Sequence, residues 1–182
     1  MPSAPELGRR RFLVQGAAAS LCFLAAPAIA TPRAPLRRVV AFDHLHTGER
    51  LDIVYWADGH YQPGALRRIN WLLRDFRNDA VHPIDPHLID LLAVLRQRLG
   101  AHAPIQVLSA YRSPATNAML ASMSEGVATN SLHLQGRAID IRLPGRPLSA
   151  VRRAALVLRG GGVGYYPRSN FVHLDVGSVR RW

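Results

Sequence analysis

The side chains best suited to chemistry in this chain are two histidines and one aspartate, His133, Asp140 and His173. Two imidazoles and one carboxylate form a ligand set that suits one Zn²⁺ ion and leaves a fourth coordination position for water. An ion held in this way lowers the pKa of its water toward about 7 and polarises a bound carbonyl, so the expected chemistry is hydrolysis. The spacing of His133 and Asp140 is not by itself a self-identifying metal motif.

The residues around these ligands alternate as in strands with one packed face. Ile139 and Ile141 flank Asp140, and apolar residues flank His173 in the same way. Because successive side chains of a strand point to opposite faces, the apolar residues would pack against helices while the ligands line the other face. If the two strands are neighbours, the ligands can meet at one point. Otherwise the Asp140 carboxylate needs another partner, and the candidates are Arg112, Arg137 and Arg142.

We expect no chemistry from the other six of the eight histidines. Some of them lie in predicted loops or at helix ends, and others lie in or beside a predicted hairpin, where a solvated imidazole needs no special role. These six are His44, His46, His60, His82, His87 and His102.

The elements expected to position the ligands form one α+β domain, with helices packed on one face of an antiparallel sheet and the zinc site on the other. Apolar residues at helical spacing predict the helices, and β-rich runs on either side of Thr47 and Gly48 predict a hairpin. His133 is expected in a loop from Ser124 to Gln135. The predicted helices span residues 63–76, 86–99, 114–123 and 148–159, and the predicted strands span residues 39–46, 50–56, 105–112, 137–143, 163–166 and 171–176.

Residues 1–30 are expected to be an export signal that is removed after Ala30. Arginines at residues 9–11 precede a mostly apolar run at residues 13–26, and this run includes the sole cysteine of the chain. The run has roughly 14 residues, short of the about 20 that a membrane-spanning helix needs. The arginine pair resembles a twin-arginine signal. We therefore expect a periplasmic mature chain without a membrane span or a disulfide, in which a tether at residues 31–38 precedes one domain at residues 39–182.

Length and composition support one folded domain. The chain has 182 residues, of which 48% are hydrophobic, enough for a substantial core and too few for two ordinary domains. It has 23 basic and 12 acidic residues, and every basic residue is arginine. Scattered arginines suit a polyanionic partner. We expect no nucleic-acid partner, because the chain carries an export signal and its few aromatic residues form no stacking ladder among the arginines.

Three segments together resemble the D-Ala-D-Ala zinc metallopeptidase family, whose members act on bacterial cell walls. They are Ser109–Ser113, the stretch from Ser131 to Asp140, and the stretch from Gly161 to His173. The last segment narrows the resemblance to the murein endopeptidases of that family, and the likeness extends over essentially the whole chain. The resemblance implies that the zinc ligands are His133, Asp140 and His173.

The resemblance also implies that Arg112 contacts substrate. A guanidinium offers a planar fork to a carboxylate or to a tetrahedral oxyanion. The alternative for Arg112 is a structural salt bridge to a neighbouring carboxylate.

One position departs from the family pattern. Many members have Glu or Asp as general base three residues before the last zinc-binding histidine, but this chain has Asn170 there. An amide cannot take a proton from water. Asp175, expected on the same strand face as His173, is our candidate either for the base or for a partner that orients His173. His46 is a further candidate for the base.

The expected function is that of a periplasmic zinc endopeptidase that hydrolyses peptide cross-links of peptidoglycan. The close relatives imply L,D-bonds between two diaminopimelate residues. One alternative is a D,D- or L,D-carboxypeptidase on murein peptides, and another is a non-catalytic, metal-containing wall-binding protein. We expect a monomer, with arginines around the site to meet the carboxylates of the murein peptides, namely Arg112, Arg137, Arg142 and Arg168.

Overall fold

The fold is that of a computed structural model, which describes Met1, residues 36–123 and residues 128–182. The chain divides into Met1–Arg33 and Ala34–Trp182, and the elements below belong to the second unit. Apart from Met1, the expected export signal lies outside the described residues, as does most of the expected tether. None of the described helices has the length and apolarity that crossing a bilayer requires.

In the described part of the chain, the strands form one eight-stranded sheet with the order β3-β2-β1-β4-β5-β7-β6-β8. Neighbouring strands are antiparallel except for the pairs β1–β4 and β6–β8, which are parallel. The α+β class is therefore confirmed, although the sheet is mixed and not purely antiparallel. The strands are β1 (Arg37–His44), β2 (Arg50–Ala57), β3 (His60–Tyr61), β4 (Ile105–Ser109), β5 (Ala138–Arg142), β6 (Gly162–Tyr166), β7 (Phe171–Asp175) and β8 (Arg180–Arg181).

The predicted helices are confirmed with small changes at their ends. They are α1 (Pro63–Leu72), α2 (Pro86–Arg98), α3 (Pro114–Met123) and α4 (Leu148–Leu158), and a short 3₁₀ helix, η1, spans Leu132–Gln135. Proline begins α1 and α2, where its missing N–H costs no hydrogen bond, and Asp85 caps α2 by accepting the N–H of His87. His133 thus lies in η1 and not in an irregular loop.

Helix α1 ends at Leu72, four residues before the predicted end at Phe76. The chain turns there because Asp75 pairs with Ala80 in a short bridge. The buried Asp75 carboxylate also accepts the N–H of Ser113 at 2.9 Å, just before α3. These contacts tie the segment after α1 to the start of α3.

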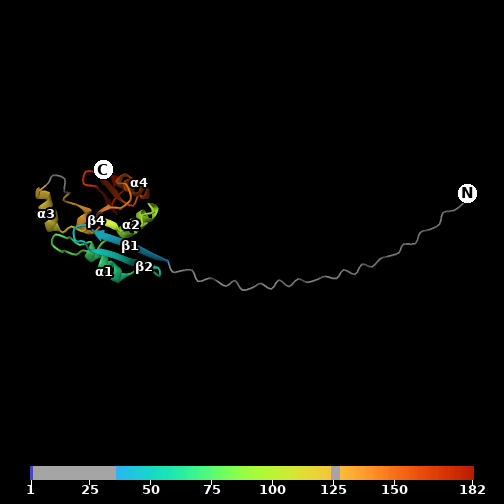
Figure 1. The fold of residues 1–182 in the computed structure, drawn as a ribbon, viewed down its shortest axis with the longest axis horizontal. Coiled ribbons are helices and arrows are strands. Elements are labelled where there is room, and N and C mark those ends of the chain that lie inside the picture. Colours follow the sequence, from blue (N-terminus) through green and yellow to red (C-terminus); the bar gives the residue numbers. More distant parts are fainter. Residues whose placement is uncertain (2–35, 124–127) are drawn as a thin grey trace. The chain divides into compact units, whose positions relative to one another are not determined.

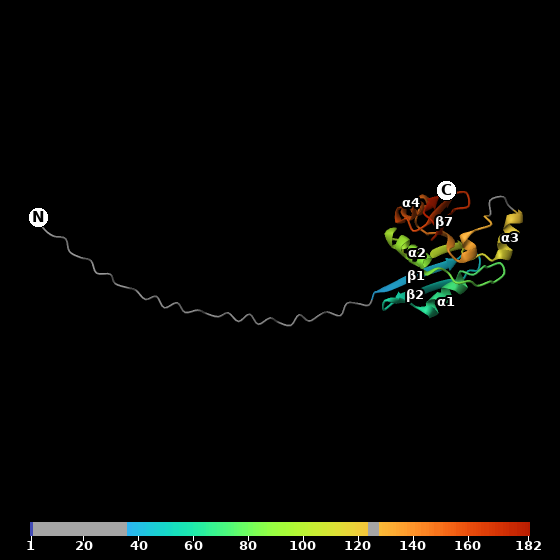
Figure 2. The same cartoon turned by 180° about the vertical axis from the view of Figure 1, so that it is seen from behind.

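The hydrophobic core lies between the sheet and the helices α1, α2 and α4. Ile139 and Ile141 of β5 are fully buried in this core, as the alternation predicts. Figures 1 and 2 show α2 and α4 beside each other, with α3 at the opposite end of the domain. The face of the sheet that carries the predicted ligands is therefore left for the site.

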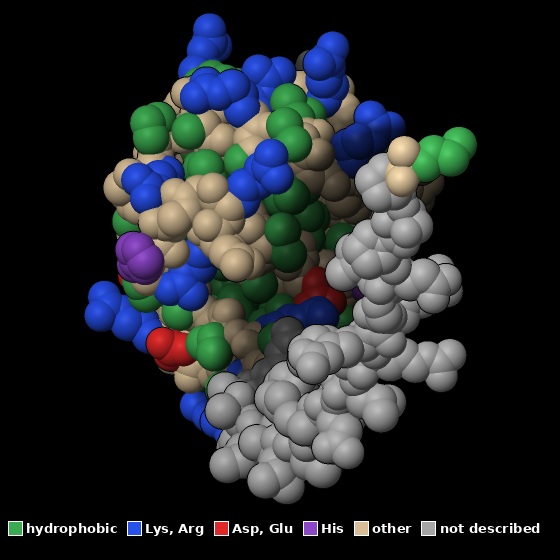
Figure 3. All heavy atoms as spheres, turned by 90° about the vertical axis from the view of Figure 1, so that its right-hand side faces the viewer, with side chains coloured by type: hydrophobic (Ala, Val, Ile, Leu, Met, Phe, Trp, Pro, Cys, Tyr) green, Lys and Arg blue, Asp and Glu red, His purple; other side chains and the backbone are tan. Residues whose placement is uncertain are grey.

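Arginine side chains are prominent on the face of the molecule that Figure 3 draws. Figure 3 shows them separated by apolar and uncharged groups on one face of the molecule, where acidic side chains are sparse. A broad positive potential of this kind attracts polyanions without selecting one.

Candidate metal centre

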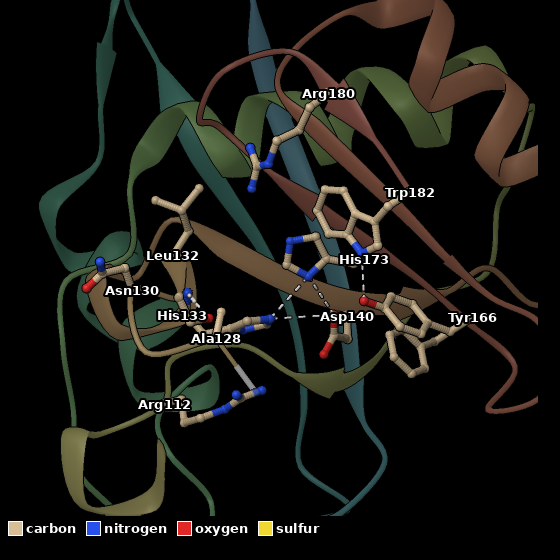
Figure 4. Close-up of a pocket in the computed structure, with 12 residues that line it drawn as sticks. Arg112, Ala128, Asn130, Leu132, His133, Asp140, Tyr166, His173, Arg180 and Trp182 are labelled. Atoms are coloured by element: carbon tan, nitrogen blue, oxygen red, sulfur yellow. Dashed lines mark hydrogen bonds and ion pairs between the residues drawn. The ribbon is translucent and has the colours of Figure 1, made fainter. Parts of the chain in front are cut away.

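The three predicted ligands meet in one place. Strands β5 and β7 are paired, with Asp140 opposite His173, and η1 brings His133 to the same point (Figure 4). His173 Nδ1 lies 3.0 Å from Asp140 Oδ1 and 3.2 Å from His133 Nε2, and His133 Nε2 lies 3.5 Å from Asp140 Oδ1. Ligand atoms of a tetrahedral zinc site are about 3.3 Å apart when the bonds are about 2.0 Å long. The separations therefore fit one ion.

A hydrogen bond from the outer ring nitrogen of His133 sets its tautomer. Its Nδ1 lies 2.6 Å from the backbone carbonyl oxygen of Ala110. A carbonyl only accepts, so Nδ1 carries the hydrogen and Nε2 presents a lone pair to the other ligands. The backbone N–H of Arg112 donates to the carbonyl of His133 at 3.1 Å, which fixes η1 against the segment after β4.

Asp175 does the same for His173 from the opposite side of the ring. His173 Nε2 donates to Asp175 Oδ2 at 3.1 Å, which leaves the Nδ1 lone pair for the site. Asp175 is fully buried, and its carboxylate accepts the N–H groups of Gly162 and Gly177 and two hydrogen bonds from Arg180. Burial by itself raises the pKa of Asp175, but these donors outweigh burial and hold the pKa well below its usual range.

Two glycines make this close packing around Asp175 possible. A Cβ atom at Gly162 would collide with Asp175 Oδ2, and one at Gly177 would lie 3.1 Å from Asp175 Oδ1. The backbone at Gly162 can therefore approach the carboxylate only because this position lacks a side chain, and at Gly177 a side chain would make the contact tight.

The arrangement favours a positive charge between the ligands. With both outer ring nitrogens used as donors, two imidazole lone pairs and the Asp140 oxygen face one another, and these acceptors repel unless a proton or a cation lies among them. Burial lowers the pKa of His173, but its hydrogen bonds to Asp140 and Asp175 outweigh burial and raise the pKa. The two imidazole nitrogens and the carboxylate oxygen therefore form a set of metal ligands that suits a divalent cation.

The alternative expectation, in which Asp140 pairs with an arginine, is wrong. Within the described residues, its ion-pair partners are His133 and His173. Arg137 donates to the backbone carbonyl of Val176, and the other candidate arginines also have partners elsewhere.

The ligands open onto a pocket of about 410 Å³. Arg112 lies on one side of the ligands and Arg180 on the other (Figure 4). Arg112 is half-buried, and burial lowers its pKa. Its Nη1 donates to Asn117 at 3.3 Å, and its Nε has no partner among the described residues. The guanidinium thus keeps hydrogen-bonding capacity, and it forms no salt bridge within the described residues.

The expected ring of arginines is only partly correct. Of the predicted set, Arg112 lines the pocket, whereas Arg142 donates to the carbonyl of Asn170 and Arg168 is exposed in the turn between β6 and β7. The sequence analysis missed Arg180, which lines the pocket and holds Asp175. An arginine in a short segment beyond β7 has no local pattern that would single it out.

None of the three positions considered for a general base faces the pocket. Asn170 is exposed with φ of 54° and borders a separate hollow, so the position three residues before His173 points elsewhere. His46 stacks on Phe76 with ring centroids 4.2 Å apart and is not part of the pocket lining. Asp175 lies behind the His173 ring, which fits the orienting role and not that of the base. Among the described lining residues, Asp140 is the only one with a carboxylate side chain.

One of the remaining histidines is not solvated as expected. His44 is 1% exposed at the end of β1. Its Nδ1 accepts the backbone N–H groups of His46 and Thr47, each at 3.3 Å. His44 therefore closes the hairpin turn as a neutral ring, and burial is the main reason that its pKa is lowered to about 4.

Comparisons with known proteins give matches over nearly the whole chain. A family model described as "Peptidoglycan L,D-endopeptidase MepK" matches residues 32–182. The chain is 42% identical over 178 residues to peptidoglycan L,D-endopeptidase MepK of Escherichia coli (strain K12), covering 97% of this chain and 98% of the relative. It is 41% identical over 179 residues to a probable MepK of Haemophilus influenzae, covering 97% of this chain and 96% of the relative.

Proposed function

This chain belongs to the peptidoglycan L,D-endopeptidase family of M15 peptidases, and from that premise we propose that it is a zinc-dependent endopeptidase that cuts peptide cross-links of peptidoglycan. The observation that carries the proposal is the convergence of His133 Nε2, Asp140 Oδ1 and His173 Nδ1 within 3.5 Å of one another, on three residues that line a pocket. If His133 and His173 had only a structural role, there would be no reason for both ring lone pairs to face the Asp140 carboxylate.

We assign the ligands of one ion to His133, Asp140 and His173. When bound, zinc supplies a Lewis acid that polarises the scissile carbonyl and makes water more acidic. The two histidines need fixed tautomers to serve as ligands, and the Ala110 carbonyl and Asp175 provide them. Asp175 is thus a positioning residue in this proposal, and the hydrogen bonds that it accepts from His173, Gly162, Gly177 and Arg180 keep it ionised.

Arg112 is the proposed substrate contact. Its half-buried guanidinium lines the pocket and forms no salt bridge within the described residues, and a guanidinium pairs well with carboxylate or developing oxyanion oxygens. Cross-links between two diaminopimelate residues carry free carboxylates near the scissile L,D-bond. The substrate that the relatives' names indicate therefore offers groups that this arginine can bind.

The same proposal places the enzyme in the periplasm as a monomer. Residues 1–30 would be a twin-arginine signal removed after Ala30, residues 31–38 a tether, and the peptidase domain would follow from residue 39. Replacing the arginines at residues 9–11 by lysine should retain the uncleaved chain in the cytoplasm. A processed periplasmic product from that variant would contradict the signal assignment.

Digestion of defined muropeptides tests the activity. The zinc-loaded protein should convert dimers cross-linked between diaminopimelate residues into monomers, and removal of the metal by a chelator should stop the reaction. Intact dimers after incubation with fully loaded protein would contradict the proposal.

The same digestion separates the alternative functions. Trimming of monomers without cleavage of dimers would indicate a carboxypeptidase. Wall binding that survives His133→Ala, with no turnover by the native chain, would indicate a non-catalytic protein.

A further inference from the structure

Two aromatic side chains form the wall of the pocket beside His173. Trp182 Nε1 donates a hydrogen bond to the Tyr166 hydroxyl oxygen at 2.7 Å, and both residues line the pocket. Figure 4 shows the tyrosine oxygen turned toward the indole nitrogen, on the side of Asp140 and His173 away from Arg112. Neither Tyr166 nor Trp182 is among the residues predicted from the sequence.

The backbone leaves room for this pair next to the metal ligands. Gly164 of β6 lies opposite His173 in the strand pairing. A Cβ atom at Gly164 would lie 2.8 Å from Tyr166 Cε2 and 2.8 Å from Trp182 Cε2. Both rings therefore lie over Gly164, and the indole is 5.2 Å from the His173 ring between centroids.

Each ring is also fixed from its other sides. Tyr166 stacks on Phe171 with centroids 4.5 Å apart. The backbone of Trp182 bonds to β6 in both directions, through Val163 and Tyr165, and the Arg180 guanidinium lies over the indole at 5.0 Å. Because these contacts restrict the rings, the Tyr166 hydroxyl is held at a defined place in the pocket.

The direction of the hydrogen bond leaves one hydrogen free. An indole N–H only donates, so it occupies an acceptor position of the Tyr166 oxygen and cannot take the hydroxyl hydrogen. Within the described residues, the Trp182 bond is the only hydrogen bond of this hydroxyl. The hydroxyl thus presents an oriented donor to whatever occupies the pocket.

We propose that the Tyr166 hydroxyl donates a hydrogen bond to an oxygen of the substrate peptide, a carbonyl or carboxylate next to the scissile bond, and that Trp182 positions it. This inference rests on the proposed endopeptidase function. Tyr166 and Arg112 then provide donors on two sides of the ligand cluster, which matches a substrate with oxygen acceptors on both sides of the bond to be cut. A preset donor needs no reorganisation during the reaction.

The first test is Tyr166→Phe, which removes only the hydroxyl. With cross-linked dimers as substrate, kcat/KM should fall at least about tenfold, because a donor to a substrate oxygen is lost. Zinc content and the thermal unfolding midpoint should remain those of the native chain. The matched control is Tyr165→Phe, since the neighbouring Tyr165 packs against the core instead, and its kcat/KM should stay within twofold.

The second test asks whether Trp182 acts through Tyr166. Trp182→Phe keeps an aromatic ring but removes the N–H, and kcat/KM should fall about threefold. Added to Tyr166→Phe, the same change should cost nothing further, because the hydroxyl that it orients is already absent. A purely structural role for Trp182 would give the same loss in both backgrounds.

The outcomes separate this inference from the proposed function. If the native chain cleaves dimers and Tyr166→Phe retains kcat/KM within twofold, the inference is wrong and the function stands. If Trp182→Phe is equally harmful with and without the hydroxyl, the positioning role is wrong. If the zinc-loaded native chain leaves dimers intact, both the function and the inference fail.

Discussion

Two carboxylates of this domain, the partly buried Asp90 and the buried Asp140, have opposite surroundings. Asp90 on α2 accepts hydrogen bonds from the Tyr55 and Tyr61 hydroxyls and from Arg38, at 2.8, 2.6 and 2.8 Å. Each of these groups has a hydrogen to give. Asp140 faces two imidazole nitrogens whose ring hydrogens are already used on the outer sides of the rings.

The difference distinguishes a structural polar cluster from a site. Burial raises the pKa of Asp90, but the three donors outweigh it and lower the pKa, while the Asp90 carboxylate and burial raise the pKa of Tyr61 to about 12. The Asp90 cluster is therefore complete as it stands. The Asp140 cluster is complete only with an added positive charge, as expected of residues that hold a metal ion.

The largest expected effect comes from Asp140→Asn, which removes the charged ligand. Zinc content should fall from about one ion per chain to near zero, and kcat/KM on cross-linked dimers should fall by about 10³-fold or more. Unfolding of the metal-free protein should change little, because the neutral amide would relieve the repulsion among acceptors. If Asp140→Asn kept its zinc and its activity, the Asp140 cluster would not be a metal site that differs from the structural Asp90 cluster.

Asp175→Asn should have a smaller effect on the same site. The amide no longer stabilises the His173 tautomer in which Nε2 carries the hydrogen, so zinc affinity should fall about 10- to 100-fold. Competition with a chelator of known affinity measures the zinc affinity of each variant. Arg180→Lys is the conservative comparison, and it should lose less affinity than Arg180→Gln. Equal zinc affinity in the native and Asp175→Asn chains would show that Asp175 does not orient the ligand.

Asp90→Asn should affect stability and not chemistry. The free energy of unfolding should fall by about 1–3 kcal/mol, because the amide leaves the partly buried hydroxyls of Tyr55 and Tyr61 without full partners. Zinc affinity and kcat should match those of the native chain, as measured by denaturant unfolding and dimer cleavage. A loss of zinc in this variant would mean that the two clusters are coupled.

The smallest effect concerns His44, a buried histidine outside both clusters. Its pKa is lowered to about 4, whereas an unfolded histidine has a pKa of about 6.5. The unfolded chain therefore binds this proton first, so stability is lost as the pH falls from about 6.5 toward 4, by roughly 1.4 kcal/mol at pH 5.5. Denaturant unfolding of the metal-free protein at several pH values measures this slope. His44→Gln should flatten it, and an unchanged slope would contradict the account.

Local periodicity was enough to predict much of the fold and the ligand face. Alternation around Asp140 and His173 predicts correctly that the isoleucines of β5 pack in the core while Asp140 lines the pocket. Helix starts at prolines were also predictable. These features depend on neighbours in the sequence, which a single chain displays.

Features that depend on distant segments could not be predicted in this way. The two-residue strand β8 has no periodicity, so the roles of Arg180 and Trp182 follow only from its pairing with β6. The burial of His44 depends on Phe76 and on a backbone turn. From the sequence, a histidine in a hairpin was expected to be solvated. The orientation of Asp175 behind the His173 ring required the side-chain geometry.

The most direct test of the metal site is anomalous diffraction at the zinc edge from crystals of the zinc-loaded protein. The account predicts one peak per chain, bonded to His133 Nε2, Asp140 and His173 Nδ1 at about 2.0–2.2 Å. A peak on His173 Nε2, a fourth protein ligand that closes the site, or zinc bound elsewhere with none at these three residues would contradict it.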